Sequence, residues 1–152
     1  MELSYRRVDQ NSTYEMAILR KQMLEELSGA AIAERRFEQI HESILCKLEH
    51  GHCLAMGAFE SDKIIACAML CYYHALPDEN SGNGRGGVLC NVYTLPEYRN
   101  RGIMTNLMIA LKHQAKDEGA QEIILTAEEN AIPLYEKLGF LKLPGAMVLM
   151  LE

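Results

Sequence analysis

EYRNRGIMTNLM, residues 97–108, places two arginines and a glycine directly before a run of residues with helical periodicity. A tight turn that opens a helix leaves the first helical N–H groups without partners, and with the helix dipole these groups form an anion site. Gly102 allows the backbone to approach a ligand, while Arg99 and Arg101 can add charge-assisted hydrogen bonds. The stretch therefore predicts binding of a phosphate-bearing ligand, with a plain turn and solvated arginines as the alternative.

The sequence before this stretch predicts two helices and four strands. Ser12 and Glu15 form a capping-box pattern that opens a helix through about Leu27. An apolar face at Phe37, Ile40, Ile44 and Leu48 predicts a second helix that ends near His50 and Gly51. Alternating or continuous apolar runs predict strands at Leu3 to Val8, Cys53 to Phe59, Lys63 to Ala75 and Gly87 to Leu95.

The sequence after the turn predicts a β-α-β arrangement that follows one longer helix. That helix has one apolar face and ends at Gly119; the face comprises Ile103, Leu107, Met108, Leu111 and Ala115. A strand from Glu122 to Thr126, a short helix from Ile132 to Leu138 closed by Gly139, and a strand from Phe140 to Leu151 complete the chain. The order β-α-α-β-β-β-α-β-α-β indicates an α/β fold of the α+β type, with a central, mostly antiparallel sheet flanked by helices. We expect one domain over residues 1–152.

Composition narrows the classes of function. A formal net charge of -6 argues against general nucleic-acid binding; it would suit a cationic substrate, although solubility alone explains it. The longest apolar run, Ile64 to Tyr73, is too short to span a membrane, and the N-terminal MELSYRRVDQ lacks the apolar core of a signal peptide, so we expect a cytoplasmic protein that is not bound to a membrane.

Cysteines and histidines give no metal-ligand pattern. The five cysteines, an odd number without a CxxC pair, lie in apolar segments and predict buried, reduced thiols. We expect no metal, because the histidines also lack ligand spacing. A G-x-G-x-x-G match at Gly82, Gly84 and Gly87 runs into a predicted strand instead of opening a helix, so a flexible hairpin loop explains it better than a dinucleotide or kinase-like site.

Two segments resemble the signatures of the GCN5-related N-acetyltransferase (GNAT) family. Arg99 to Met104 is similar to its acyl-CoA pyrophosphate loop, Gln/Arg-x-x-Gly-x-Gly/Ala, with Met104 in the place of the last glycine or alanine. Asn130 to Phe140 is similar to its second signature, a short helix that ends in Leu-Tyr-x-x-Leu-Gly-Phe. The order of predicted elements agrees with this family over nearly the whole chain.

The resemblance implies acetyl-CoA as cosubstrate and assigns residues to it. The strand before the turn would lie along the pantetheine arm, and the turn would hold the pyrophosphate. Tyr135 would give a proton or hydrogen bond to the leaving sulfur, and Asn91 would orient substrate or water. The implied cofactor-binding residues are Val92, Tyr93, Thr94, Arg99, Asn100, Arg101, Gly102, Ile103, Met104, Thr105 and Asn130.

A general base is missing from the strand at Val88 to Thr94, because an amide such as Asn91 cannot accept a proton at neutral pH. We expect deprotonation through water, with Glu25, Glu26, Glu97 and His74 as other candidates. The resemblance implies an N-acetyltransferase that acts directly on a primary amine of a small molecule or peptide. The alternative is a non-catalytic acyl-CoA sensor or interaction module. The sequence leaves the acceptor open, and a homodimer is one of the assemblies that it allows.

Overall fold

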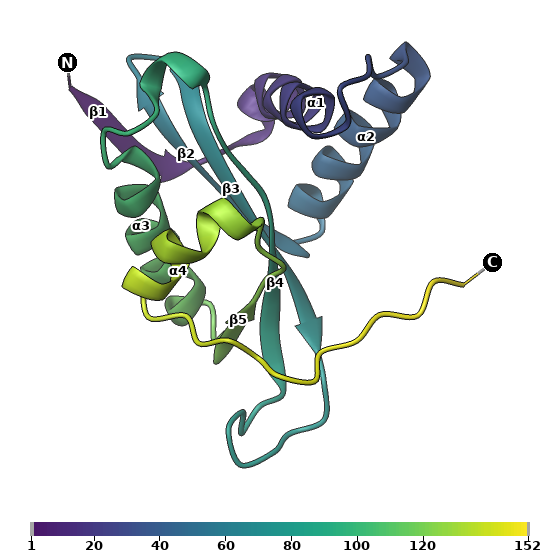
Figure 1. Cartoon of the computed structure of the whole chain (residues 1–152), viewed down its shortest axis with the longest axis vertical. Coiled ribbons are helices and arrows are strands. Elements are labelled where there is room, and N and C mark those ends of the chain that lie inside the picture. The colour runs from purple at the N-terminus through teal and green to yellow at the C-terminus, as the bar shows by residue number, and fades with distance from the viewer. Residues whose placement is uncertain (1, 152) are drawn as a thin grey trace.

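The computed structural model describes residues 2–151 and is built around one twisted sheet (Figure 1). The sheet has the order β1-β2-β3-β4-β5. The first four strands pair in antiparallel fashion, and β5 is parallel to β4. The strands are β1 (Leu3–Arg7), β2 (Cys53–Glu60), β3 (Lys63–His74), β4 (Arg85–Thr94) and β5 (Glu122–Ile124).

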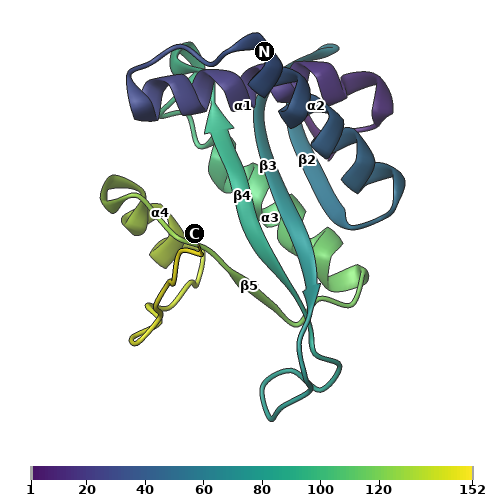
Figure 2. The same ribbon diagram turned by 90° about the vertical axis from the view of Figure 1, so that its right-hand side faces the viewer.

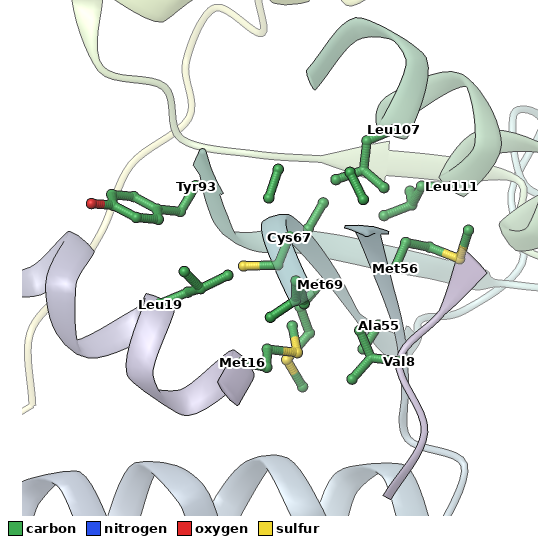
Figure 3. Close-up of a cluster of buried hydrophobic side chains, with 14 of the residues drawn as sticks. Val8, Met16, Leu19, Ala55, Met56, Cys67, Met69, Tyr93, Leu107 and Leu111 are labelled. Atoms are coloured by element: carbon green, nitrogen blue, oxygen red, sulfur yellow. The ribbon is translucent and has the colours of Figure 1, made fainter. Parts of the chain in front are cut away.

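Helices cover both faces of this sheet. One face carries α1 (Thr13–Ser28) and α2 (Glu34–Glu49), and the other carries α3 (Ile103–Asp117) and α4 (Ile132–Lys137) (Figure 1). Met16 and Leu19 of α1 enter the core from one side, while Leu107 and Leu111 of α3 enter from the other (Figure 3). All five apolar residues predicted on the face of α3 are buried, which confirms its amphipathic pattern. Within residues 2–151, no helix is long and apolar enough to cross a membrane.

The predicted capping box at the start of α1 is wrong. Ser12 makes no side-chain capping bond, and the Glu15 carboxylate accepts a hydrogen bond from Ile64 N at 3.5 Å instead. A short 3-10 turn, Gln10–Ser12, precedes α1, and the carboxylate of Asp9 accepts from Asn11 N at 2.9 Å. The cap therefore lies three residues earlier, because the chain enters the helix through that turn.

The predicted final strand, Phe140 to Leu151, is also wrong in this structure. The segment turns at Pro144 and Gly145 and pairs with no strand of the described chain, and its end projects away from the helices and sheet (Figure 1). Apolar sequence alone does not make a strand, because a strand needs a neighbouring edge for its backbone hydrogen bonds. Its large apolar side chains are exposed: Leu141, Leu143, Met147, Val148, Leu149, Met150 and Leu151.

Two irregularities of β4 shape the middle of the sheet. Asn91 and Val92 stand opposite the single residue Ala68 of β3, which makes a β-bulge, and Asn91 has φ of 52°. On its other side, β4 pairs with β5 only over Gly86 to Val88. Beyond Val88 the two strands separate, and Figure 2 shows β4 diverging from β5 and α4. The edge of β4 from the bulge to Thr94 therefore pairs with no strand on this side within the described residues.

Candidate active site

The turn between β4 and α3 presents free backbone N–H groups. A 3-10 turn, Pro96–Tyr98, follows β4, and both Asn100 (φ 61°) and Gly102 (φ 72°) have left-handed backbone conformations. The first hydrogen bond of α3 runs from Asn106 N to Gly102 O at 3.1 Å, so the N–H groups of residues 103–105 have no partner within the helix. They point out of the helix start, where its dipole favours an anion.

Gly102 is required by conformation and not by lack of space. A Cβ built on Gly102 would meet nothing within 4 Å, whereas its φ of 72° is rare for residues that have a side chain. The side chain of Ile103 is buried in the core, so only its backbone can face a ligand. Met104 and Thr105 are half-buried, and their N–H groups belong to the same first helical turn.

The two arginines of the turn differ in their partners. Arg99 pairs with the Glu26 carboxylate of α1 at 2.9 Å and donates from Nε to Thr94 O at 2.9 Å. Arg101 donates to the backbone oxygen of Glu97 at 2.8 Å and forms no ion pair with any described residue. The charge of Arg99 is therefore balanced within the protein, and that of Arg101 is not.

Tyr93 and Thr94 are the last residues of β4 before this turn. The hydroxyl of the buried Tyr93 donates to Glu26, and burial together with this carboxylate raises the pKa of Tyr93 to about 12. The Arg99 guanidinium lies 5.3 Å from the centre of the Tyr93 ring. Glu26, Tyr93 and Arg99 thus form one cluster that fixes the turn to α1. Val92, the second residue of the bulge, is half-buried and directly precedes this cluster on β4.

Tyr135 lies in α4, the helix that Figure 2 shows standing apart from β4. It is 8% exposed, and burial is the cause that raises its pKa above the ordinary value. Its ring packs edge-on against Phe140, with centroids 5.5 Å apart. Asn130 lies in the exposed 3-10 turn, Glu129–Ala131, that precedes α4. The tyrosine is therefore a protonated hydroxyl at neutral pH.

The four side chains considered as a general base, three carboxylates and one imidazole, lie in different surroundings. Glu25 accepts a hydrogen bond from Ile32 N at 2.9 Å, and Glu97 is exposed on the turn. Hydrogen bonds from Tyr93 and Arg99 lower the pKa of Glu26, which makes its carboxylate a weaker base. His74 stands opposite Arg85 in the sheet, and Arg85 precedes Asn91 by six residues, or about 20 Å along β4. His74 therefore lies too far from the bulge to accept a proton there directly.

A pair of thiols beside the bulge was not assigned a function by the sequence pattern. The sulfur atoms of Cys71 and Cys90 lie 3.6 Å apart across β3 and β4, and all five cysteines are free. The prediction of buried thiols is correct for Cys53 and Cys67 but wrong for Cys46, which is exposed on α2. No three His, Cys, Asp or Glu side chains gather to hold a metal ion between residues 2 and 151.

These features define an α/β protein with a split sheet edge that leads to a turn whose N–H groups lack helical partners. The profile of the Acetyltransferase (GNAT) family matches residues 17–140. The chain therefore belongs to the acetyltransferase (GNAT) family, and the resemblance stated from the two sequence segments is confirmed.

Individual relatives agree with this assignment. The chain is 36% identical over 86 residues to N-alpha-acetyltransferase 30 of Schizosaccharomyces pombe, and this match covers 55% of the chain and 54% of that protein. The chain thus matches about half the length of this curated relative. A predicted acetyltransferase from Clostridium acetobutylicum, solved with acetyl-CoA, is 26% identical with a TM-score of 0.87, and 98% of the chain aligns with 96% of that structure. A GCN5-related N-acetyltransferase from Ralstonia eutropha JMP134 shares the fold, at 19% identity, a TM-score of 0.81 and coverage of 98% and 99%.

Proposed function

We propose that this protein transfers the acetyl group of acetyl-CoA to a primary amine of a small molecule or peptide. One observation carries the proposal: the unpaired edge of β4 leads directly into the turn whose N–H groups at residues 103–105 lack helical partners. The amides of a pantetheine arm can pair with a free strand edge, and a pyrophosphate suits a helix N-terminus. That a relative was solved with acetyl-CoA supports the same cosubstrate.

Residues of β4, of the turn before α3 and of the turn before α4 would each contact a different part of this cosubstrate. Val92, Tyr93 and Thr94 would present backbone groups to the pantetheine arm. The backbone from Asn100 to Thr105 would hold the pyrophosphate, with Arg101 adding the charge that no described carboxylate balances. Arg99 would act through the turn that it fixes. Asn130 would contact the cosubstrate from the exposed turn before α4.

The chemistry is a direct transfer. The neutral amine attacks the thioester carbonyl carbon, the carbon–sulfur bond breaks, and the amine loses a proton to water. Tyr135 would donate its hydroxyl proton to the departing thiolate and regain a proton from the water that received the amine proton; its raised pKa keeps the hydroxyl protonated at neutral pH before the transfer. The amide of Asn91 would orient the amine or the water. No metal is part of this proposal.

A domain that binds acyl-CoA without turnover is the other function that these features allow, because no carboxylate base lies on β4. Release of free thiol from acetyl-CoA with a panel of amines separates the two functions. Release that depends on the amine supports the transferase. Calorimetric binding of acetyl-CoA without any release would support the binding module instead.

Arg101→Glu tests the site of the pyrophosphate. We expect weaker CoA binding in calorimetry, with a loss that shrinks at high salt because part of the attraction is screened. Lys112→Glu is the matched control, since Lys112 is an exposed cation on the same helix away from its N-terminus. Unchanged affinity of Arg101→Glu at low salt would contradict the assignment.

We also propose a second copy of the chain as the partner of the C-terminal segment. Residues 147–151 are large, apolar and exposed on both sides of an extended backbone, with Met147 95% exposed, and β5 is an edge strand without a second neighbour. A strand that is apolar on both faces is typical of the inside of a sheet. A homodimer that joins this segment to β5 of the other copy would cover the apolar side chains of the segment and the free edge of β5.

The five free thiols support a reducing compartment, and we propose the cytoplasm.

A further inference from the structure

A cavity of about 250 Å³ lies between the α1–α2 layer and strands β3 and β4, next to the bulge. Figure 2 shows these two helices lying over the strands. The cavity is separate from the turn that the cosubstrate would occupy. It is lined by Asn91, the bulge residue of β4 that would orient the amine or the water. A molecule in the cavity would therefore approach the bulge from the face opposite α3.

Three cations line this cavity, and no carboxylate does among the residues that the structure describes. Arg20 comes from α1, while Arg36 and Lys47 come from α2, where their spacing of 11 residues places them on one helical face. None of the three forms an ion pair within residues 2–151. A concentration of unbalanced positive charge in a chain of net charge -6 is the opposite of what the overall composition suggests.

Asn91 supplies an independent sign of a ligand. It is 4% exposed and lines the cavity, yet neither its Oδ1 nor its Nδ2 has a hydrogen-bond partner. A buried amide without partners is costly, so such groups normally bond to protein, water or ligand. Its oxygen can accept from an amine N–H, and its nitrogen can donate to an anion.

Two thiols, Cys71 and Cys90, line the cavity beside these cations. The hydrogen bond from Cys90 lowers the pKa of Cys71, and the charges of Lys47 and Arg20 lower it further. The lowered pKa of Cys71 agrees in direction with the positive charge that Lys47 and Arg20 bring to the cavity.

We propose that this cavity is the acceptor site and that the acceptor is a small amine that also bears a carboxylate. The carboxylate would lie among Arg20, Arg36 and Lys47, and the amine would lie at Asn91, beside the thioester. The proposal rests on the proposed acetyltransferase function and adds the class of its substrate. It disfavours polycationic amines, which the same charges would repel.

The test compares amines that differ only in charge. Each amino acid of a panel is assayed with acetyl-CoA beside its carboxamide and the diamine of equal length, with release of thiol as the readout. We expect kcat/KM for the best carboxylate to exceed that for its carboxamide by about 10-fold or more, as for a charge-assisted bond. Carboxamides or diamines that react as well as the carboxylates would overturn the proposal while leaving the acetyltransferase function intact.

Two variants locate the effect. Lys47→Gln and Arg20→Gln should raise KM for the carboxylate about 10-fold and remove most of the preference over the carboxamide, with acetyl-CoA affinity unchanged. Arg35→Gln is the matched control, because Arg35 is an exposed neighbour of Arg36 that does not line the cavity. A preference that survives both variants would place the carboxylate elsewhere and overturn the assignment.

Calorimetry separates a failure of this proposal from a failure of the proposed function. If no amine is acetylated although acetyl-CoA binds, the transferase proposal fails, and the same amino acids and carboxamides are titrated directly into the protein. Carboxylates that bind more tightly than their carboxamides, with the difference lost in Lys47→Gln, still support the cavity. Equal binding of the two series, or none, overturns it.

Discussion

Tyr135 combines a buried ring with a hydroxyl whose pKa is raised by that burial alone. Tyr135→Phe should therefore lower kcat by about 10²–10⁴-fold, the range of general acid catalysis, and leave the dissociation constant of CoA nearly unchanged. The fold should survive because only the hydroxyl is lost. Steady-state rates with calorimetry provide the measurement, and wild-type kcat in the variant would remove the tyrosine from the mechanism.

The raised pKa of Tyr135 also bears on how the rate of acetyl transfer depends on pH. Because the folded pKa lies above the usual value of about 10, Tyr135 keeps its proton at every pH below about 10, and no loss of acid catalysis is expected there. The rate should instead rise with pH toward the pKa of the amine, provided that single-turnover rates show that chemistry limits turnover. A plateau near pH 6.5 would indicate a protein base such as a histidine.

Cysteine reactivity gives an independent view of the charge beside the bulge. Burial raises the pKa of both Cys53 and Cys67 to about 12, whereas the Cys90 hydrogen bond and nearby cations lower that of Cys71. Since the thiolate is the nucleophile, iodoacetamide at neutral pH should modify half-buried Cys71 and spare the other two. Peptide mass spectrometry measures this directly, and modification of Cys67 before Cys71 would contradict the assigned charge distribution.

At the scale of elements, the turn before α3 depends on one backbone conformation. Gly102→Ala should cost roughly 1–2 kcal/mol of stability, because φ of 72° is strained for a residue with a Cβ, and should also weaken CoA binding. Gly51→Ala is a matched control: Gly51 has φ of 65° and equally open space, and it follows α2, away from the Glu26 cluster that fixes the turn. We expect a similar fall in Tm for both variants and a loss of CoA affinity for Gly102→Ala only. Equal CoA affinity in the two variants would argue against the turn as the pyrophosphate site.

For the whole molecule, the exposed C-terminal segment predicts a dimer. Light scattering after size exclusion should give twice the mass of the chain, and Val148→Lys combined with Met150→Lys should give the mass of one chain, because charges are costly inside an interface. Ile109→Lys, a change at an exposed apolar residue outside the segment, is a control for added charge. A monomeric wild-type protein would contradict the dimer.

Sequence periodicity predicted correctly those helices and strands whose apolar side chains pack against the sheet or the helices of the same chain. The α3 residues Leu107 and Leu111 are fully buried because a 3.6-residue pattern needs only the sheet that it covers. The same logic failed for residues 140–151, where pairing depends on an edge that the pattern does not specify. It also missed the cavity, since Arg20 and Lys47 are far apart in sequence and only the packing of α1 beside α2 brings them to Asn91.

The cluster of Glu26, Tyr93 and Arg99 has an energetic consequence for the two substrates. Glu26 ties the turn to α1, and Arg20 of the same helix lies six residues earlier, or about 9 Å along the helix axis, in the cavity. A shift of the turn on cosubstrate binding would be carried by α1 to the acceptor. Any resulting change in affinity must be reciprocal: the factor by which CoA tightens or loosens the amine equals the factor by which the amine changes the affinity for CoA.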